Sequence, residues 1–209
     1  MEIAIKSFKV GILDYGIGNL NSIVNAVERL GHRAEIIAEI DQHSQLSHLI
    51  IPGVGAFGSC ANKIRDRVSI NVLSDLVLGT KIPTLGICVG MQLMCHSSEE
   101  DNSVEGLGWF PGKIKKLRSS DEARVPHVGW NEVLFKNNSL GFHQNSSSHF
   151  YFDHSYAYVK EQSAEVEAVC DYADGFSAII RRENIVGVQF HPEKSQKNGA
   201  KLLENFFNL

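Results

Sequence analysis

Near the start of the chain, a short continuous run of hydrophobic residues is followed by a segment in which hydrophobic residues recur at helical spacing. Residues 9 to 15 (KVGILDY) form an apolar run of the length of a buried strand. Residues 19 to 30 place apolar side chains on one helical face before Gly31, namely Leu20, Ile23, Val24, Val27 and Leu30. A strand followed by a helix and a glycine stop is typical of half a βαβ unit.

The same alternation continues through the first hundred residues. Short strands are predicted at 34 to 38 and at 48 to 51 (HLII), and helical material at 57 to 78, ending at Gly79. The next apolar run, PTLGIC, leads directly into Cys88. Strands that alternate with helices favour a three-layer α/β fold around a mainly parallel, doubly wound sheet.

The second half of the chain has a different texture. Short strand-like segments are separated by Gly, Asn, Asp and Ser clusters, at 131 to 135, 149 to 159, 165 to 170, 176 to 181 and 185 to 190. They predict added antiparallel strands. The closing GAKLLENFFNL predicts a helix that packs on the sheet through Leu202, Leu203, Phe206 and Leu209. Because no linker or repeat is visible, we expect one domain over residues 1 to 209.

Composition and charge narrow the class of protein. The chain has 209 residues, is 43% hydrophobic and carries a formal net charge of -4, which fits a globular protein and argues against nucleic acid as a partner. It has no long apolar run and no signal-peptide arrangement at its start, so we expect no membrane association and a cytoplasmic location. The four cysteines form no CxxC pair, and at least three of them are expected to be buried.

A candidate nucleophile lies at Cys88. Residues 86 to 90 read GICVG, with a strand before and a helix-compatible run after, which is the pattern of a nucleophile elbow with sulfur in place of oxygen. The helix N-terminus favours the negative charge of a thiolate, and the Val89 N–H can donate to an oxyanion. A buried strand that ends in a glycine-rich turn would give the same five residues, so this segment alone does not decide.

A candidate base follows the last predicted strand. Residues 189 to 195 read QFHPEKS, in which Pro192 stiffens the chain between His191 and Glu193. The imidazole can face a nucleophile while the carboxylate orients it. Alone, His191 would more often be a histidine at the end of a strand. An α/β fold that brings strand ends together makes the catalytic interpretation the better one.

GICVGMQ and QFHPEKS together resemble the class I glutamine amidotransferases. The resemblance implies a catalytic triad of Cys88, His191 and Glu193, and it assigns Gln92 to the binding of L-glutamine. Further segments, DYGIGNL, IPGVGAFG, SEE, VPHVGWN and YFDHSY, are similar to one branch of that family, the glutaminase subunits of imidazole glycerol phosphate synthases. The similar segments run from residue 10 almost to the C-terminus.

The branch resemblance assigns further roles around the glutamine pocket. It implies that Val54 gives a second oxyanion donor, that Gly53 and Gly55 border the substrate and allow the peptide between them to rotate, and that Ser155 and Tyr156 bind the substrate. An ordinary glycine-rich turn remains a rival for the switching role. Asp153 stands where the family more often has an apolar or small residue.

The resemblance also implies a partner. It is a (β/α)8-barrel cyclase that forms a heterodimer with the chain, makes imidazole glycerol phosphate and AICAR in histidine biosynthesis, and lies near Trp130, Asn131 and Lys194. No cofactor or metal is expected, and Asn21 in the place of the third glycine of a dinucleotide-binding loop argues against a bound NAD in particular. Two alternatives stay open: a related subunit that feeds ammonia to another acceptor, such as a surface sugar, and a non-catalytic regulatory subunit on the same fold.

Overall fold

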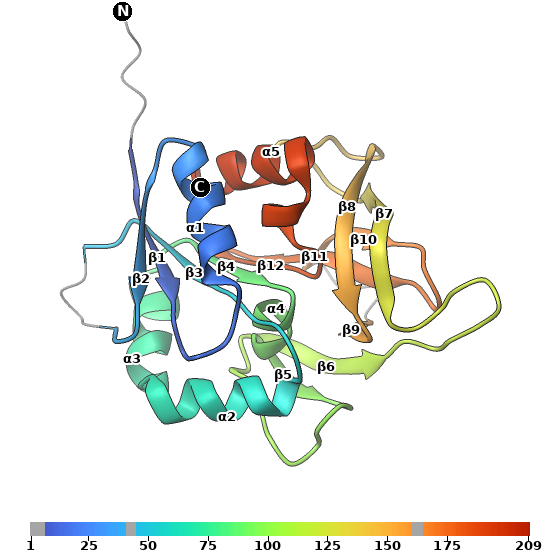
Figure 1. Cartoon of the computed structure of the whole chain (residues 1–209), viewed down its shortest axis with the longest axis horizontal. Helices are drawn as coiled ribbons and strands as arrows, with labels where there is room; N and C mark the ends of the chain where they lie inside the picture. The colour runs from blue at the N-terminus through green and yellow to red at the C-terminus, as the bar shows by residue number, and fades with distance from the viewer. Residues whose placement is uncertain (1–6, 41–44, 160–164) are drawn as a thin grey trace, which may run out of the picture.

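The computed structural model describes residues 7–40, 45–159 and 165–209, and the statements below concern these residues. The first six residues, on which the expectation about a signal peptide partly depends, lie outside them. The described chain forms a nine-stranded sheet in the order β2-β1-β3-β4-β12-β11-β10-β7-β8 and a three-stranded sheet in the order β5-β6-β9 (Figure 1).

One half of the large sheet is parallel. Its strands are β2 (Arg33–Ile37), β1 (Lys9–Leu13), β3 (His48–Ile51), β4 (Thr84–Ile87) and β12 (Ile185–Val188). Every residue of β3, β4 and β12 is buried. This is the continuous apolar pattern of strands that are covered on both faces. The predicted doubly wound α/β sheet is confirmed.

Helices cover both faces of the parallel half (Figure 1). Helices α1 (Leu20–Arg29) and α5 (Gln196–Phe206) lie on one side, and α2 (Phe57–Arg67), α3 (Ile70–Ser74) and α4 (Val89–Leu93) lie on the other. Helix α1 buries Ile23 and Val27, two of the apolar positions that predicted it. None of the helices in these described ranges is long and apolar enough to span a bilayer.

The other half of the large sheet is antiparallel. It contains β11 (Phe176–Arg182), β10 (Val166–Cys170), β7 (His127–Phe135) and β8 (Ser147–His154). The small sheet combines β5 (Cys95–Ser98), β6 (Phe110–Lys116) and β9 (Tyr156–Tyr158). The predicted antiparallel additions are confirmed, and Ser155 separates β8 from β9 within the segment 149 to 159.

Two details of the sequence prediction are wrong. The helical segment expected over 57 to 78 breaks at Val68, which is buried in an extended conformation (φ -124, ψ 130), and α3 then starts after Ser69. A π-helical turn, η1 (Asp75–Gly79), completes the segment. Leu209 does not pack on the sheet, because it is 43% exposed and lies beyond the end of α5, whereas Phe207 is fully buried.

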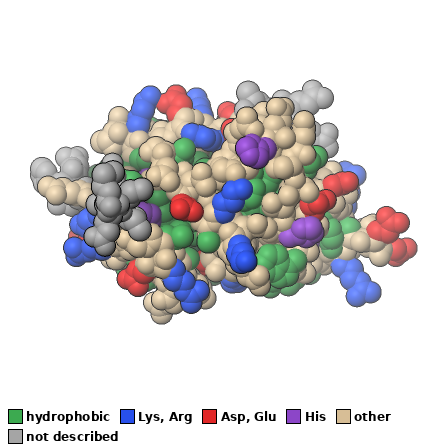
Figure 2. Space-filling model, turned by 90° about the horizontal axis from the view of Figure 1, so that it is seen from above, with side chains coloured by type: hydrophobic (Ala, Val, Ile, Leu, Met, Phe, Trp, Pro, Cys, Tyr) green, Lys and Arg blue, Asp and Glu red, His purple; other side chains and the backbone are tan. Residues whose placement is uncertain are grey.

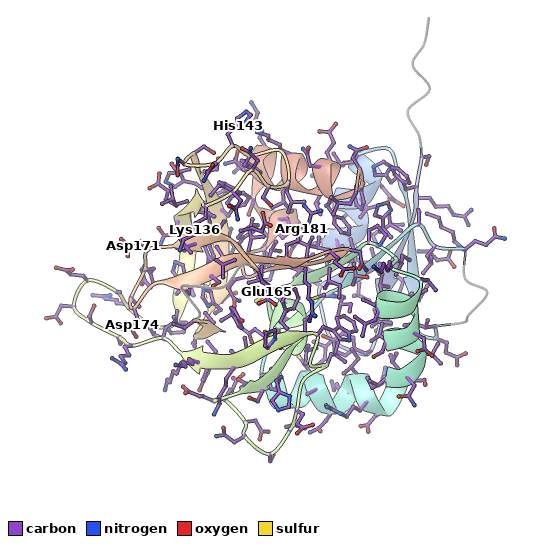
Figure 3. The ribbon with its side chains drawn as sticks, turned by 180° about the vertical axis from the view of Figure 1, so that it is seen from behind. Lys136, His143, Glu165, Asp171, Asp174 and Arg181 are labelled. Atoms are coloured by element: carbon purple, nitrogen blue, oxygen red, sulfur yellow. The ribbon has the colours of Figure 1, made fainter. Side chains whose placement is uncertain are left out.

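The surface of the described chain carries charges of both signs. Seen from above, over α1 and α5, basic and acidic side chains are interspersed and do not gather into one patch (Figure 2). From behind, charged side chains also lie along the antiparallel half of the sheet, among them Glu165, Asp171, Asp174 and Arg181 (Figure 3). All four cysteines are buried and free, which confirms the expectation that at least three are buried.

Candidate active site

Cys88 lies at a sharp turn between β4 and α4. Its φ of 53° and ψ of -111° form a conformation that a non-glycine residue rarely adopts, so the turn is held by its surroundings. Gly90, one of the two glycines that flank Cys88, has no room for a side chain. A β-carbon at this position would collide with the backbone carbonyl of Ile51. A β-carbon at Gly86 would lie 2.8 Å from the Met91 nitrogen. The predicted strand-to-helix elbow is therefore present.

His191 and Glu193 lie immediately after β12, the neighbour of β4 in the sheet. Val188 at the end of β12 pairs with Ile87, the residue before Cys88, so the two strand ends are adjacent. The His191 ring nitrogen Nδ1 is 2.8 Å from Glu193 Oε1, and both side chains are at most 4% exposed. Nδ1 therefore carries the hydrogen that Glu193 accepts, which leaves Nε2 for a partner in the cavity.

The environment of His191 favours its protonated form. Burial by itself lowers the pKa of this imidazole, but its hydrogen bonds to Cys88 and Glu193 and the charges of these two groups raise the pKa to about 10. The second oxygen of Glu193, Oε2, is buried without a hydrogen-bond partner among the described residues. The site is thus built to hold a positive imidazolium next to the Cys88 sulfur.

The segment Pro52 to Gly55 follows β3, the other neighbour of β4, and runs past the elbow. The Tyr15 hydroxyl donates to the Pro52 carbonyl at 2.5 Å, and the Cys60 thiol donates to the Val54 carbonyl at 3.5 Å. No hydrogen bond within the described ranges uses the N–H of Val54. The carbonyls of Pro52 and Val54 are therefore both held by hydrogen bonds. The Gly53–Val54 peptide, which lies between these two carbonyls, is held by none among the described residues.

A cavity of about 270 Å³ opens beside Cys88. It is lined by residues of all three predicted groups: the catalytic Cys88 and His191, the oxyanion donors Val54 and Val89, and the substrate contacts Gly55, Gln92, Ser155 and Tyr156. Gly53 does not line this cavity. It packs against α4, where a β-carbon would lie 2.5 Å from the Gly90 nitrogen, so the close approach of the two backbones is a structural reason for glycine at this position.

Gln92 is buried in a hydrogen-bond network at the wall of the cavity. Its amide nitrogen donates to the Tyr156 carbonyl at 2.8 Å and to Gln189 Oε1 at 3.2 Å. Both hydrogens of the Gln92 amide are therefore used, and only Oε1 is left to accept from a ligand. Gln189 in turn directs its amide nitrogen to the Cys88 sulfur at 3.7 Å.

Four further residues line the cavity, Glu100, Pro126, Asp153 and His154, and the sequence prediction gave none of them an individual role in binding. Glu100 follows β5 and accepts the N–H of Phe57, the first residue of α2, at 2.7 Å, and this contact holds its carboxylate at the cavity. The SEE motif contains it, but spacing alone gave it no role. The backbone carbonyl of Asp153 lies 3.8 Å from the Cys88 sulfur, and its side chain is exposed.

Two of the predicted partner-facing residues, Trp130 and Asn131, lie on β7, and the third, Lys194, lies in the 3-10 turn Pro192–Lys194. Trp130 is 47% exposed, and its ring centroid lies 6.2 Å from that of Tyr151 on the neighbouring strand β8. Lys194 Nζ lies 5.5 Å from the same Tyr151 ring. Asn131 turns inward, because its amide lies 3.1 Å from the His127 ring. In the described residues, no group of three or more His, Cys, Asp or Glu side chains could hold a metal ion.

Residues 11–209 match the family model described as Glutamine amidotransferase class-I. A relative from Leptospira interrogans, named imidazole glycerol phosphate synthase subunit HisH, is 44% identical over 204 residues, which cover 96% of this chain and 100% of that protein. A relative from Vibrio vulnificus, named imidazole glycerol phosphate synthase subunit HisH 2, is 42% identical, with 96% of this chain and 94% of that protein covered.

Solved structures show the same fold at low sequence identity. The PurLQS structure from Thermotoga maritima superposes with a TM-score of 0.76 at 17% identity, covering 97% of this chain and 99% of that chain. A structure described as a glutamine amidotransferase superposes with a TM-score of 0.74 at 18% identity, covering 95% of this chain and 97% of that chain.

Proposed function

The chain belongs to the class-I glutamine amidotransferase family, in the branch of the HisH subunits, and from this premise we propose that it hydrolyses L-glutamine at Cys88. The observation that carries the proposal is the meeting of three segments at the carboxyl ends of adjacent parallel strands. Cys88 follows β4, the His191–Glu193 pair follows β12, and the Gly53–Val54 peptide follows β3. This is the edge at which α/β sheets bind ligands.

The proposed reaction begins with the Cys88 thiolate beside the His191 imidazolium. The sulfur attacks the carboxamide carbon of glutamine, and the resulting oxyanion is held by backbone N–H groups of Val54 and Val89. His191 gives its proton to the leaving nitrogen, so ammonia departs and a glutamyl thioester remains. His191 then takes a proton from water, which hydrolyses the thioester to glutamate, while Glu193 keeps the imidazole oriented.

The cavity offers complementary groups for the amino-acid end of glutamine. The Glu100 carboxylate is suited to the α-ammonium group, and Ser155 and Tyr156 form the wall on which that end rests. Gln92 Oε1 is left as an acceptor for a substrate N–H. These contacts place the carboxamide toward Cys88, and no cofactor enters the reaction.

Replacing Val54 by proline tests the oxyanion donor. Proline has no N–H, so we expect kcat for glutamine hydrolysis to fall by about a hundredfold or more while the KM for glutamine changes little. Val54→Ala keeps the N–H and trims an exposed side chain, so it is the matched control and should retain near-normal kcat. Equal losses in the two variants would show that the side chain matters and not the donor.

The product ammonia needs an acceptor on another protein, and we propose a (β/α)8-barrel cyclase subunit that docks over the cavity mouth. The docking face is formed by exposed apolar side chains near that mouth, namely Val54, Val128 and Trp130, which are 40 to 58% exposed. Tyr151 and Lys194 flank Trp130 on this face. Aromatic side chains in such a surface carry much of the binding energy.

Trp130→Ala is expected to weaken the complex with the barrel subunit. Losing one central aromatic anchor raises Kd by about thirtyfold, measured by titration calorimetry with the purified barrel subunit. Leu78→Ala is the control, because Leu78 is 50% exposed, belongs to η1 and does not line the glutamine cavity. A Kd that stays unchanged in Trp130→Ala would place the partner elsewhere.

The acceptor that we propose is the precursor of imidazole glycerol phosphate and AICAR, in the histidine pathway of the cytoplasm. The free cysteines suit that reducing compartment. The name HisH 2 of the Vibrio relative motivates a second candidate, a related subunit that serves another acceptor. Identification by mass spectrometry of the product made from glutamine by the co-purified complex separates the two, because only the first yields imidazole glycerol phosphate.

A further inference from the structure

Two buried histidines that the proposed reaction does not use lie side by side behind the glutamine cavity. His127 in β7 and His154 in β8 are cross-strand partners, 3% and 7% exposed. His127 Nδ1 and His154 Nε2 are 2.9 Å apart, and His154 also lines the cavity. One of these two nitrogens must donate and the other must accept, so the contact has a defined direction.

The groups at both ends of the pair fix this direction. His154 Nδ1 lies 2.9 Å from the Tyr156 carbonyl, which can only accept, so Nδ1 carries the hydrogen and Nε2 accepts from His127. His127 Nε2 is then bare, and it faces the Asn131 amide nitrogen, which can only donate, at 3.1 Å. Asn131 Oδ1 accepts the Glu132 N–H at 2.8 Å, which fixes the orientation of that amide. Both ends therefore require the Nδ1–H tautomer in each ring.

Both imidazoles are neutral in this arrangement. The His127 ring is stacked between Tyr172 and Phe152, at centroid distances of 4.0 and 4.7 Å. Burial lowers the pKa of His127 to about 4, and burial together with the nearby charges of His127 and His191 lowers the pKa of His154 to about 3. A proton added to His154 Nε2 would place its N–H against the N–H of His127 Nδ1. The series of hydrogen bonds from Asn131 to the Tyr156 carbonyl, called the relay below, therefore has a fixed direction and does not take up a proton.

The relay ends on the group that holds Gln92. The Tyr156 carbonyl accepts from His154 Nδ1 and from Gln92 Nε2, at 2.9 and 2.8 Å, so both of its lone pairs are used. Gln92 continues to Gln189, and Gln189 to the Cys88 sulfur. An unbroken series of polar contacts thus joins Asn131, next to Trp130 on the docking face, to the nucleophile.

Resting on the proposed glutaminase function, we propose that His127 and His154 are positioning residues of the glutamine pocket. They hold the Tyr156 carbonyl, and through it Gln92, in the orientation that presents Gln92 Oε1 to the substrate. They do not exchange protons with glutamine. The relay begins at Asn131 in β7, the strand that carries Trp130 on the docking face. The position of Gln92 therefore depends on the position of β7.

A pair of substitutions at His154 separates positioning from packing. His154→Asn can place an amide N–H near the position of Nδ1 and still donate to the Tyr156 carbonyl, whereas His154→Phe keeps the ring that packs on Phe152 and Phe176 but cannot donate. For the complex with the barrel subunit, we expect His154→Phe to raise the KM for glutamine by about tenfold, the value of one lost buried hydrogen bond. His154→Asn is expected to stay within about threefold of the wild type, with kcat little changed in both.

A substitution at Tyr172, the ring stacked on His127, is the control for the His154 variants. Tyr172→Phe keeps the stacking on His127 and should leave the KM unchanged, and ammonia-dependent synthesis by the complex should be the same in all variants. If His154→Phe matches the wild type, or if His154→Asn has the higher KM of the two, packing is the whole role and the proposal is overturned. If the unsubstituted complex does not hydrolyse glutamine, the proposed function itself fails.

The tautomers give a second test that needs no substitution. Two-bond ¹H–¹⁵N spectra of the unsubstituted chain should show both rings as Nδ1–H tautomers at neutral pH. An Nε2–H form or an imidazolium at either His127 or His154 would break the relay and overturn the proposal, even where a variant fails to fold.

Discussion

Cys88→Ala is expected to abolish glutamine-dependent turnover by the complex and to leave ammonia-dependent turnover intact. The substitution removes the only atom that can form the thioester in the proposed reaction, so glutamine hydrolysis should fall by at least about ten-thousandfold. Ammonia supplied from solution bypasses Cys88 and reaches the partner's site directly. Steady-state rates of the reconstituted complex with glutamine or with ammonium salt measure the two activities separately.

The control for Cys88→Ala is Cys170→Ala. Both substitutions remove a buried thiol group and leave the β-carbon as a methyl group. Cys170 lies in β10 and does not line the glutamine cavity, so Cys170→Ala should keep glutamine turnover. Loss of both activities in a folded and still associated Cys88→Ala complex would contradict the proposed division of labour. Retained glutamine turnover would remove Cys88 from the mechanism altogether.

Gly90→Ala is expected to disrupt the elbow and the fold together. The added methyl group would collide with the backbone carbonyl of Ile51, which belongs to β3 and cannot move without disturbing the centre of the sheet. We expect the free energy of unfolding to fall by about 3 kcal/mol, measured by denaturant titration. Any variant protein that still folds should hydrolyse glutamine poorly, because α4 and Cys88 shift away from β3.

Gly79→Ala is the matched control for this substitution. A β-carbon at Gly79, the last residue of η1, has no atom within 4 Å, so the free energy of unfolding should change by less than about 0.5 kcal/mol. A Gly90→Ala protein as stable as Gly79→Ala would mean that β3 and α4 are not packed as closely as the structure shows.

Much of the fold could be predicted from the sequence because its pattern is local. The helical spacing from Leu20 to Leu30 gave α1, and the apolar run HLII gave β3, since burial on one or both faces dictates which positions are apolar. The break at Val68 was not predictable in this way. Its side chain is apolar and fits a helical face, and only the packing of the chain decides that it is buried in an extended conformation.

Some residues of the candidate site could be predicted from local motifs, and others could not. GICVG and HPEKS pointed to Cys88, His191 and Glu193, because an elbow and a His-x-Glu pair are short motifs with a direct chemical reason. Gln189, Glu100 and His154 were given no role. Each of them acts through contacts with residues 43 to 101 positions away or on a neighbouring strand, and no spacing along the chain reveals such contacts.

By itself the sequence determined the strands, the helices and the types of reactive side chain, since these follow from periodicity and from the chemistry of single residues. Tertiary structure alone decided that β4 lies between β3 and β12, so that the residues after their carboxyl ends share one cavity. It also decided that the Gly53 backbone lies close to that of Gly90 and that the rings of His127 and His154 point at each other. Strand order and cross-strand register are properties of long-range pairing, which no local pattern encodes.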